Sequence, residues 1–431
     1  MIKKKILRLF LLFIFLALSL IIFKKFNKYY SQNDFAKIII LALLASNFFL
    51  GFAIKKFSKL SLIFFSYFIL IIYSVNGLLV YFDLQNTPEK KIEKILIKRG
   101  ENFDKRKILE VVKEERLKGK NIYPYVVPRE FLKLNKKEIP LTPLPKTIFV
   151  SCNEYGTWKN IQTDKYGFNN KKFLNSFDIL LMGDSFAEGS CVEQKYEPAS
   201  LLSNDYQLTT YNIGISGNGP LISLALAHEI KSIVEFDYLV WLIFDNDFYD
   251  LSLEKNSNFL RDYLDTNFIS NDYFAKIGNK IDFQKKYIEE NLESFKSGFS
   301  LTESILELKP IINRINKLIN RKELEDAIEY DKEIFEKVFD KISFLYPEKK
   351  VIVVYLPETT CFKNRSEECN QRFDEISSFS KKIIYLNFFQ YLKDNIVNHK
   401  EMYALGQSRA HFSPAGYNQL VKFIYNNIKK Q

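Results

Sequence analysis

The fold can be inferred from one short segment, Ile179-Leu180-Leu181-Met182-Gly183-Asp184-Ser185-Phe186-Ala187-Glu188-Gly189. Its apolar run is too short for a helix and ends in a turn signal, which predicts a buried parallel strand. Gly183 lets the chain turn sharply at the carboxyl end of that strand, the edge where open α/β sheets place their ligands. We therefore expect Ser185 at a strand-to-helix turn with an exposed hydroxyl. Such a serine is either a nucleophile with a base beside it or the N-cap of a helix.

After residue 147 the sequence alternates between short apolar runs and helical patterns. Four further runs predict strands, and they lie at 210–213, 238–244, 351–356 and 383–386. This alternation predicts an α/β domain over 147–431, in which helices cover both faces of a mostly parallel sheet. Residues 250–349 separate the third and fourth strands and carry helical periodicity. We expect them to form a helical insertion, because they are too long for an ordinary crossover.

Three apolar stretches open the chain and predict transmembrane helices within residues 1–82. They lie at 6–23, 36–54 and 60–82, and each is close to the ~20 residues that a helix needs to cross the hydrocarbon core. The first is not expected to be a cleaved signal peptide, because no small-x-small site precedes Lys24 and two more spans follow. Seven positive charges on one side of these spans against three on the other predict a cytoplasmic amino terminus. The remainder is then expected to lie outside the cytoplasm, on a protein held in the lipid bilayer.

The net charge of +11 is concentrated near the amino terminus. Residues 1–91 contain 13 basic and 3 acidic side chains, whereas the remainder contains 49 and 48. The excess therefore belongs to the flanks of the predicted spans and not to a basic face, which argues against a nucleic-acid partner.

Residues 83–146 are expected to link the spans to the α/β domain. They begin as a stalk rich in Lys and Glu and continue, after residue 120, as an extended connector whose prolines break regular structure. No candidate catalytic residue is identified in them.

The four cysteines all follow the predicted spans, in what would be an oxidising compartment. We expect Cys361 to pair with Cys369 across a short polar loop, and Cys152 to pair with Cys191. The alternative is four free thiols. No spacing of these residues resembles a zinc site, so no metal is expected.

Four residues fall at or beyond the ends of predicted strands and would lie along one edge of the sheet. They are Ser185, Gly217, Asn246 and His411. Each has an ordinary alternative, because glycines occur in turns, asparagines cap helices and histidines lie on surfaces. Together they offer a nucleophile, a base and donors for an oxyanion, which are the groups that acyl transfer by a serine requires.

This set resembles the four sequence blocks of the SGNH, or GDSL-type, hydrolase superfamily, over about 147–250 and 350–431. The resemblance implies a flavodoxin-like three-layer fold and a serine esterase that needs no cofactor. It implies that Ser185 is the nucleophile and His411 its base. The oxyanion hole would comprise the backbone amides of Ser185 and Gly217 and the side-chain amide of Asn246.

One position departs from the superfamily, which usually has an aspartate three residues before the histidine. Ser408 occupies that position here. Its hydroxyl is a candidate for orienting the imidazole, but it carries no charge to stabilise the imidazolium. Three alternatives follow: the enzyme works as a dyad, another carboxylate substitutes, or activity has been lost.

A second resemblance is to a bacterial group of membrane-anchored SGNH-like proteins, which carry a stretch like Asp164-Lys165-Tyr166-Gly167-Phe168-Asn169-Asn170. Members of that group are commonly tied to acylation or deacylation of cell-surface polysaccharide. The resemblance implies an ester hydrolase or O-acyltransferase anchored in the bacterial inner membrane, with a periplasmic carboxyl-terminal domain and an ester-bearing glycan as its partner. The alternative is a catalytically weak glycan-binding or assembly protein that keeps the fold.

Overall fold

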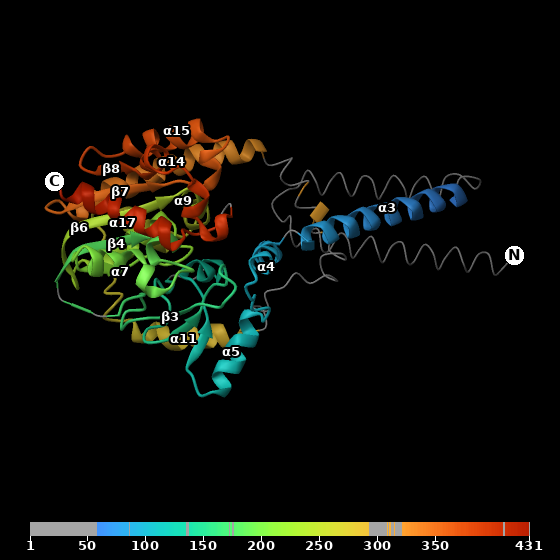
Figure 1. Cartoon of the computed structure of the whole chain (residues 1–431), viewed down its shortest axis with the longest axis horizontal. Helices are drawn as coiled ribbons and strands as arrows, with labels where there is room; N and C mark the ends of the chain where they lie inside the picture. The colour runs from blue at the N-terminus through green and yellow to red at the C-terminus, as the bar shows by residue number, and fades with distance from the viewer. Residues whose placement is uncertain are drawn as a thin grey trace. The chain divides into compact units, whose positions relative to one another are not determined.

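The computed structural model describes most of the chain from Ser58 onward (Figure 1). The residues left undescribed are 1–57, 86, 135–137, 172, 175, 293–307, 309, 312–313, 315–320, 408–409 and 431. The chain divides into two compact units, one comprising 1–87 with 299–319 and the other 88–298 with 320–431.

In the first unit, α3 (Ser58–Gln85) covers the third predicted span. The spans predicted at 6–23 and 36–54 lie outside the described residues. Within the described part of the chain, no helix combines the length and the apolar character that crossing a membrane requires.

A five-stranded sheet forms the centre of the second unit. Its strand order is β5-β4-β6-β7-β8, and every neighbouring pair is parallel. The strands are β4 (Ser176–Gly183), β5 (Thr210–Asn212), β6 (Glu235–Phe244), β7 (Lys350–Leu356) and β8 (Ile384–Asn387). Each predicted strand overlaps one of these, so the predicted parallel α/β sheet is confirmed. The order is flavodoxin-like, with the first strand of the sheet next to the second and the third.

Helices cover both faces of the sheet, because alternate side chains of each strand point to opposite sides. On β4, Leu180 packs into one apolar core and Leu181 into the other. The helices of the first core are α8 (Pro220–Ile230), α14 (Arg321–Leu345) and α15 (Ser366–Ser377). Those of the second are α7 (Pro198–Asp205), α16 (Phe388–Asn395) and α17 (Pro414–Ile428). The result is the three-layer arrangement that the alternating pattern predicts.

The segment between β6 and β7 is mostly helical where it is described, apart from turns and irregular structure at 265–277. It contains α9 (Asn246–Glu254), α10 (Asn258–Arg261), η3 (Asp262–Leu264), α11 (Gly278–Glu290) and α14. The last of these packs against α8, and Phe339 of α14 stacks on Trp241 of β6 with 5.0 Å between ring centroids. The end of the expected insertion is therefore a layer helix of the domain itself.

The stretch expected to be an extended connector has regular structure and packs on the domain. Strand β1 (Ile122–Pro124) pairs in parallel with β2 (Ile148–Val150), which pairs antiparallel with β3 (Asn160–Gln162). The expected stalk contains α4 (Pro88–Arg99) and α5 (Ile108–Leu117), and the expected connector also contains η1 (Pro128–Leu134). Short helical turns elsewhere are α6 (Ser185–Glu188), η2 (Gln194–Tyr196), η5 (Thr359–Phe362), η6 (His399–Met402) and η7 (Ala404–Gly406).

The segment 164–170 fastens the chain to the edge of the main sheet. The carboxylate of Asp164 accepts a hydrogen bond from the Tyr211 hydroxyl at 2.7 Å. The side-chain amide of Asn170 bonds to both backbone groups of Asn212 on β5, at 2.9 Å each. Asn170 thus occupies hydrogen-bonding groups that an edge strand would otherwise leave free.

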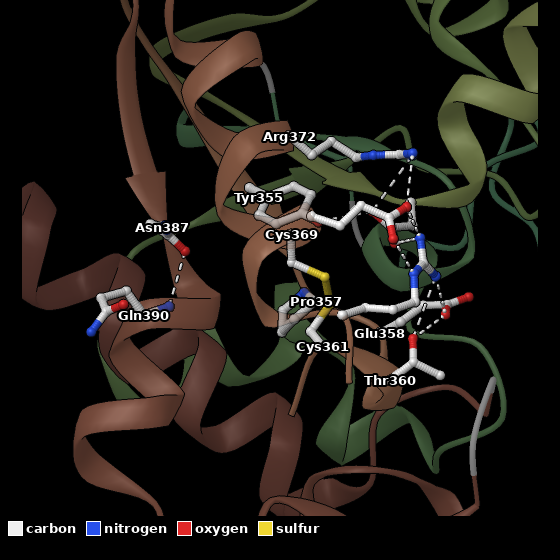
Figure 2. Close-up of a disulfide and its surroundings, with 12 residues drawn as sticks. Tyr355, Pro357, Glu358, Thr360, Cys361, Cys369, Arg372, Asn387 and Gln390 are labelled. Carbon is white, nitrogen blue, oxygen red and sulfur yellow. Dashed lines mark hydrogen bonds and ion pairs between the residues drawn. A yellow bond between two sulfur atoms is a disulfide. The ribbon is translucent and has the colours of Figure 1, made fainter. Parts of the chain in front are cut away.

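The Cys361–Cys369 disulfide joins η5 to α15, as Figure 2 shows. Close by, Asp245 accepts a hydrogen bond from the Tyr355 hydroxyl at 2.8 Å and lies 3.8 Å from a guanidinium nitrogen of Arg372. These contacts fix the chain at the carboxyl end of β6, where α9 begins.

Candidate active site

The sharp turn after β4 puts Ser185 at the carboxyl edge of the sheet. Gly183 has φ +144°, and a Cβ there would lie 2.5 Å from the carbonyl oxygen of Leu242 on the neighbouring strand. Only glycine therefore fits at this position. Asp184 caps α6 by accepting a hydrogen bond from the Phe186 amide at 2.9 Å. Ser185 is the first residue of α6 and is 9% exposed.

The hydroxyl of Ser185 donates to Oδ2 of Asp184, with 3.4 Å between the oxygens. The described residues show no hydrogen bond from Ser185 to His411, although the His411 ring lies beside Phe186 with 5.3 Å between ring centroids. Catalytic hydrogen bonds are often long in an empty site and tighten when substrate binds. The structure thus brings nucleophile and base into one site without joining them.

Glu154 holds His411 in a fixed orientation. Its Oε1 lies 2.9 Å from Nδ1 of the imidazole, and its Oε2 accepts a hydrogen bond from the His411 backbone amide at 3.1 Å. A carboxylate only accepts, so Nδ1 carries the proton and Nε2 has the free lone pair that a general base needs. This is the role that the aspartate of a serine triad has.

The carboxylate of this site was not identified from the sequence. Of the three alternatives above, the geometry corresponds to the second, in which another carboxylate substitutes. Ser408 itself lies outside the described residues. A signal for Glu154 does exist in the sequence, because Cys152 was expected to pair with Cys191. That pairing brings the neighbours of Cys152 to the neighbours of Ser185.

The structure contains this disulfide, with 5.5 Å between the two Cα atoms. It ties the segment carrying Glu154 to the loop after α6, and Sγ of Cys191 lies 3.3 Å from Nδ1 of His411. Glu154 is therefore fixed to the nucleophile loop by a covalent bond two residues away.

The pKa of His411 is raised above its ordinary value. Burial disfavours the imidazolium, but the hydrogen bond and negative charge of Glu154, with the charges of Asp184 and Glu188, outweigh that effect. The imidazolium that forms when Ser185 loses its proton is stabilised by the same charges.

Two backbone amides are available for an oxyanion. Gly217 follows β5 with φ +74°, a conformation that favours glycine. The amide of Ile215 donates to the carbonyl of Gly183 at 3.2 Å, which joins this loop to the nucleophile turn. Among the described residues, the amides of Ser185 and Gly217 have no acceptor. That these two amides form an oxyanion hole stays a prediction.

Asn246 begins α9 next to the nucleophile turn, but its amide donors are occupied. Its Nδ2 donates to Oδ2 of Asp184 at 3.1 Å and to Oδ2 of Asp250 at 2.9 Å. Its Oδ1 is buried with no partner among the described residues. The expected third donor of the oxyanion hole is thus engaged by two carboxylates.

A group of buried carboxylates surrounds Asn246: Asp184, Asp247, Asp250 and Glu254. Burial raises the pKa of all four, that of Asp250 to about 6 and that of Glu254 to about 8. Arg129 of η1 pairs with Asp250 through Nη1. No sequence pattern predicts a site role for this arginine, which lies in the expected connector.

Two groups of described residues have the spacing of metal ligands. One comprises Glu154, Cys191 and His411, and the other Asp245, Cys361 and Cys369. All three cysteines are in disulfides and offer no thiolate, so neither group has the donor set of a zinc site.

No family model matches the chain, and no curated protein matches it. Among solved structures it is similar to a Streptococcus pneumoniae protein described as a platelet activating factor, with 16% identity, 59% of this chain and 84% of that chain covered, and a TM-score of 0.29. A lipolytic protein of the G-D-S-L family from Desulfitobacterium hafniense has 12% identity, coverage of 59% and 99%, and a TM-score of 0.29. A carbohydrate esterase family 2 enzyme with a carbohydrate binding domain, from Corynascus thermopiles, has 10% identity, coverage of 64% and 73%, and a TM-score of 0.31.

At these TM-scores the likenesses decide nothing about the site, whose chemistry follows from its own geometry. The strand order is flavodoxin-like, and Ser185 and Asn246 come directly after the carboxyl ends of β4 and β6.

Proposed function

We propose that the protein is a serine ester hydrolase with the triad Ser185, His411 and Glu154. The observation that carries the proposal is the contact between Glu154 and Nδ1 of His411, beside the turn that presents Ser185. A serine hydroxyl becomes a nucleophile only with a base to take its proton, and a carboxylate orients that base and stabilises its cation. The three side chains come from separate parts of the chain.

In the proposed reaction, Oγ of Ser185 attacks the carbonyl carbon of the ester while its proton passes to Nε2 of His411. The tetrahedral intermediate collapses, the alcohol leaves with that proton, and the acyl group stays on Ser185. Water, activated by His411, then releases the acid and restores the serine. A sugar hydroxyl in place of water in the last step would make the site an O-acyltransferase.

A cavity beside the triad supports a carbohydrate as the alcohol part of the ester. Its volume is about 970 Å³, and it reaches Cys191, whose Sγ lies 3.3 Å from Nδ1 of His411. Asn160 and Gln162, both exposed on β3, offer amides for hydroxyl groups. Aromatic rings suit the apolar faces of sugars, and the cavity is lined by Tyr155, Trp158, Phe173 and Tyr196. We therefore propose an acyl ester of a polysaccharide, such as an acetyl ester, as substrate.

The proposed location is outside the cytoplasm, with the amino-terminal apolar segments as a membrane anchor. Both disulfides support it, because such bonds persist in oxidising compartments. A cell-surface polysaccharide would be within reach of a domain anchored there.

The test uses the full-length protein with two substrates, p-nitrophenyl acetate and acetylated xylo-oligosaccharides, and measures released nitrophenol and acetate. We expect turnover of both and its loss in Ser185→Ala. Asn160→Ala combined with Gln162→Ala should lower turnover of the oligosaccharide and leave that of the aryl ester unchanged. Turnover that survives Ser185→Ala would contradict the proposal. Binding of the oligosaccharide by the wild type without turnover of either ester would favour the alternative, a glycan-binding protein.

A further inference from the structure

Arg129 faces the loop that is expected to bind the oxyanion. Its side chain is 29% exposed, and its Nη1 donates to Oδ1 of Asp250. Its Nη2 lies on the side of Gly217 where any other residue would have its Cβ, because a Cβ built on Gly217 would lie 3.2 Å from that nitrogen. One guanidinium nitrogen is therefore fixed by a carboxylate while another faces the glycine.

Negative charge surrounds the place where the oxyanion would form. Asp184 directly precedes Ser185, and Asp250 lies one helical turn after Asn246. Both carboxylates accept from the Asn246 amide, so this side chain neutralises neither and has no donor to spare. An oxyanion added here meets like charges in a partly buried site, which is unfavourable unless a cation is close.

Arginine has the chemistry that this position requires. Its guanidinium is planar, always charged and carries five N–H donors in a fixed arrangement. One nitrogen can therefore stay with Asp250 while Nη2 donates to a ligand. Val127, two residues before Arg129, also lies against Gly217, with 3.6 Å from its Cγ2 to the built Cβ. Residues 127–129 therefore pack against the loop that carries Gly217.

We propose that Arg129 is a catalytic residue of this esterase, whose Nη2 donates to the oxyanion of the tetrahedral intermediate alongside the amides of Ser185 and Gly217. The inference rests on the proposed function. One well-placed oxyanion donor accounts for about 10²–10³-fold in kcat. Because the carbonyl of the bound ester is uncharged, the contact strengthens only as the oxyanion forms, so the effect belongs to kcat and not to KM.

The experiment measures kcat and KM of the full-length protein on p-nitrophenyl acetate, a substrate with no charge of its own. Arg129→Gln should lower kcat about 10²-fold with KM within about threefold of the wild type. It should also weaken, by a similar factor, inhibition by phenylboronic acid, which forms a tetrahedral adduct with the serine. Lys133→Gln is the matched control, because Lys133 lies in the same η1 and pairs with Glu130 on the surface.

Arg129→Lys separates catalysis from a structural role and serves as the decisive variant if Arg129→Gln does not fold. A lysine keeps the charge and the pairing with Asp250 but has one nitrogen, so wild-type thermal stability with a lowered kcat supports the proposal. Wild-type stability with wild-type kcat overturns it, as does unchanged kcat in a folded Arg129→Gln. Failure of the proposed function gives a different result, namely a wild type without turnover.

Discussion

The imidazole of His411 is oriented by a carboxylate that lies far away in the sequence. Glu154 contacts both the ring and the backbone amide of His411, at 2.9 and 3.1 Å. Two contacts from one carboxylate fix both the rotamer and the tautomer of the ring. A site built in this way does not need the aspartate that Ser408 replaces.

Glu154→Gln is expected to lower kcat/KM on an aryl ester by up to about 10⁴-fold, because the ring loses its fixed tautomer and its counter-charge. Glu154 raises the pKa of His411, so its removal lowers that pKa. The base is then neutral at lower pH, and the acidic limb of the kcat/KM profile should move to lower pH. A pH series of initial rates measures both effects. Glu367→Gln, on the exposed surface of α15, is the control. A profile unchanged in Glu154→Gln would show that this carboxylate does not act on His411.

The sequence predicts the position of those site residues that lie just after the end of a strand. Ser185 and Gly217 lie where a buried strand stops, and a pattern of strands predicts their neighbourhood. Glu154 and Arg129 lie before the sheet begins, and only tertiary packing brings them to it. Asn246 lies beside the nucleophile turn, but no sequence pattern shows that two carboxylates accept hydrogen bonds from its amide.

Helix α8 begins directly after the loop that carries Gly217, and its N-terminus is capped by a carboxylate from another helix. Glu254 of α9 accepts hydrogen bonds from the amides of Gly219, Leu221 and Ile222, at 2.6, 2.8 and 3.3 Å. The N-cap itself is Gly219, which has no side chain to offer. Burial raises the pKa of Glu254 from 4.5 to about 8, although these hydrogen bonds favour the charged form.

This shift makes the second unit less stable as pH rises. A carboxyl with a raised pKa in the folded state contributes stability that is complete below pH 4.5 and lost as pH rises through about 8. Urea unfolding, followed by the fluorescence of Trp158 and Trp241, should therefore give a free energy that falls between pH 5 and 8. Glu254→Gln should flatten that dependence, whereas Glu235→Gln, on the exposed start of β6, should not. An equal slope in both variants would contradict the assignment.

The two disulfides are expected to have different consequences. Replacing Cys152 and Cys191 by serine frees the segment that holds Glu154, and a misplacement of about 1 Å can cost about 10²-fold in turnover. Replacing Cys361 and Cys369 is the matched control, which should lower Tm and leave kcat/KM within about threefold, because the contacts described for the His411 ring are with Glu154, Cys191 and Phe186. Equal kcat/KM in both double variants would show that the first disulfide does not position the base.

Regular structure in the main sheet could be predicted because β4, β6 and β7 are long and largely buried, so they form continuous apolar runs, and the short β5 and β8 alternate with helical patterns. Strands β1, β2 and β3 have three residues each, which is too short for a periodic pattern. Their hydrogen-bonding partners decide their conformation. Prolines in the same stretch indicated an extended link, whereas Pro128 begins η1.

The second unit begins at Pro88, and the part before the main sheet contributes to its core. Five side chains between β1 and β2 are buried in the same apolar core as those of α8 and β6, namely Val126, Phe131, Ile139, Leu141 and Leu144. A fragment that begins at Thr147 would expose that core and lose Arg129. We expect a fragment from Pro88 to melt at a clearly higher temperature and to keep more esterase activity than one from Thr147. Equal Tm and equal turnover of the two would contradict this account of the core.

The most direct test of the proposed triad is covalent labelling of the full-length protein by a fluorophosphonate, with the modified peptide identified by mass spectrometry. An activated serine attacks this reagent, whereas an ordinary serine does not. The account predicts one adduct on Ser185, formed much more slowly in His411→Ala and Glu154→Gln and absent in Ser185→Ala. No adduct on the folded wild type, or an adduct on Ser185 whose rate is the same in Glu154→Gln, would contradict it.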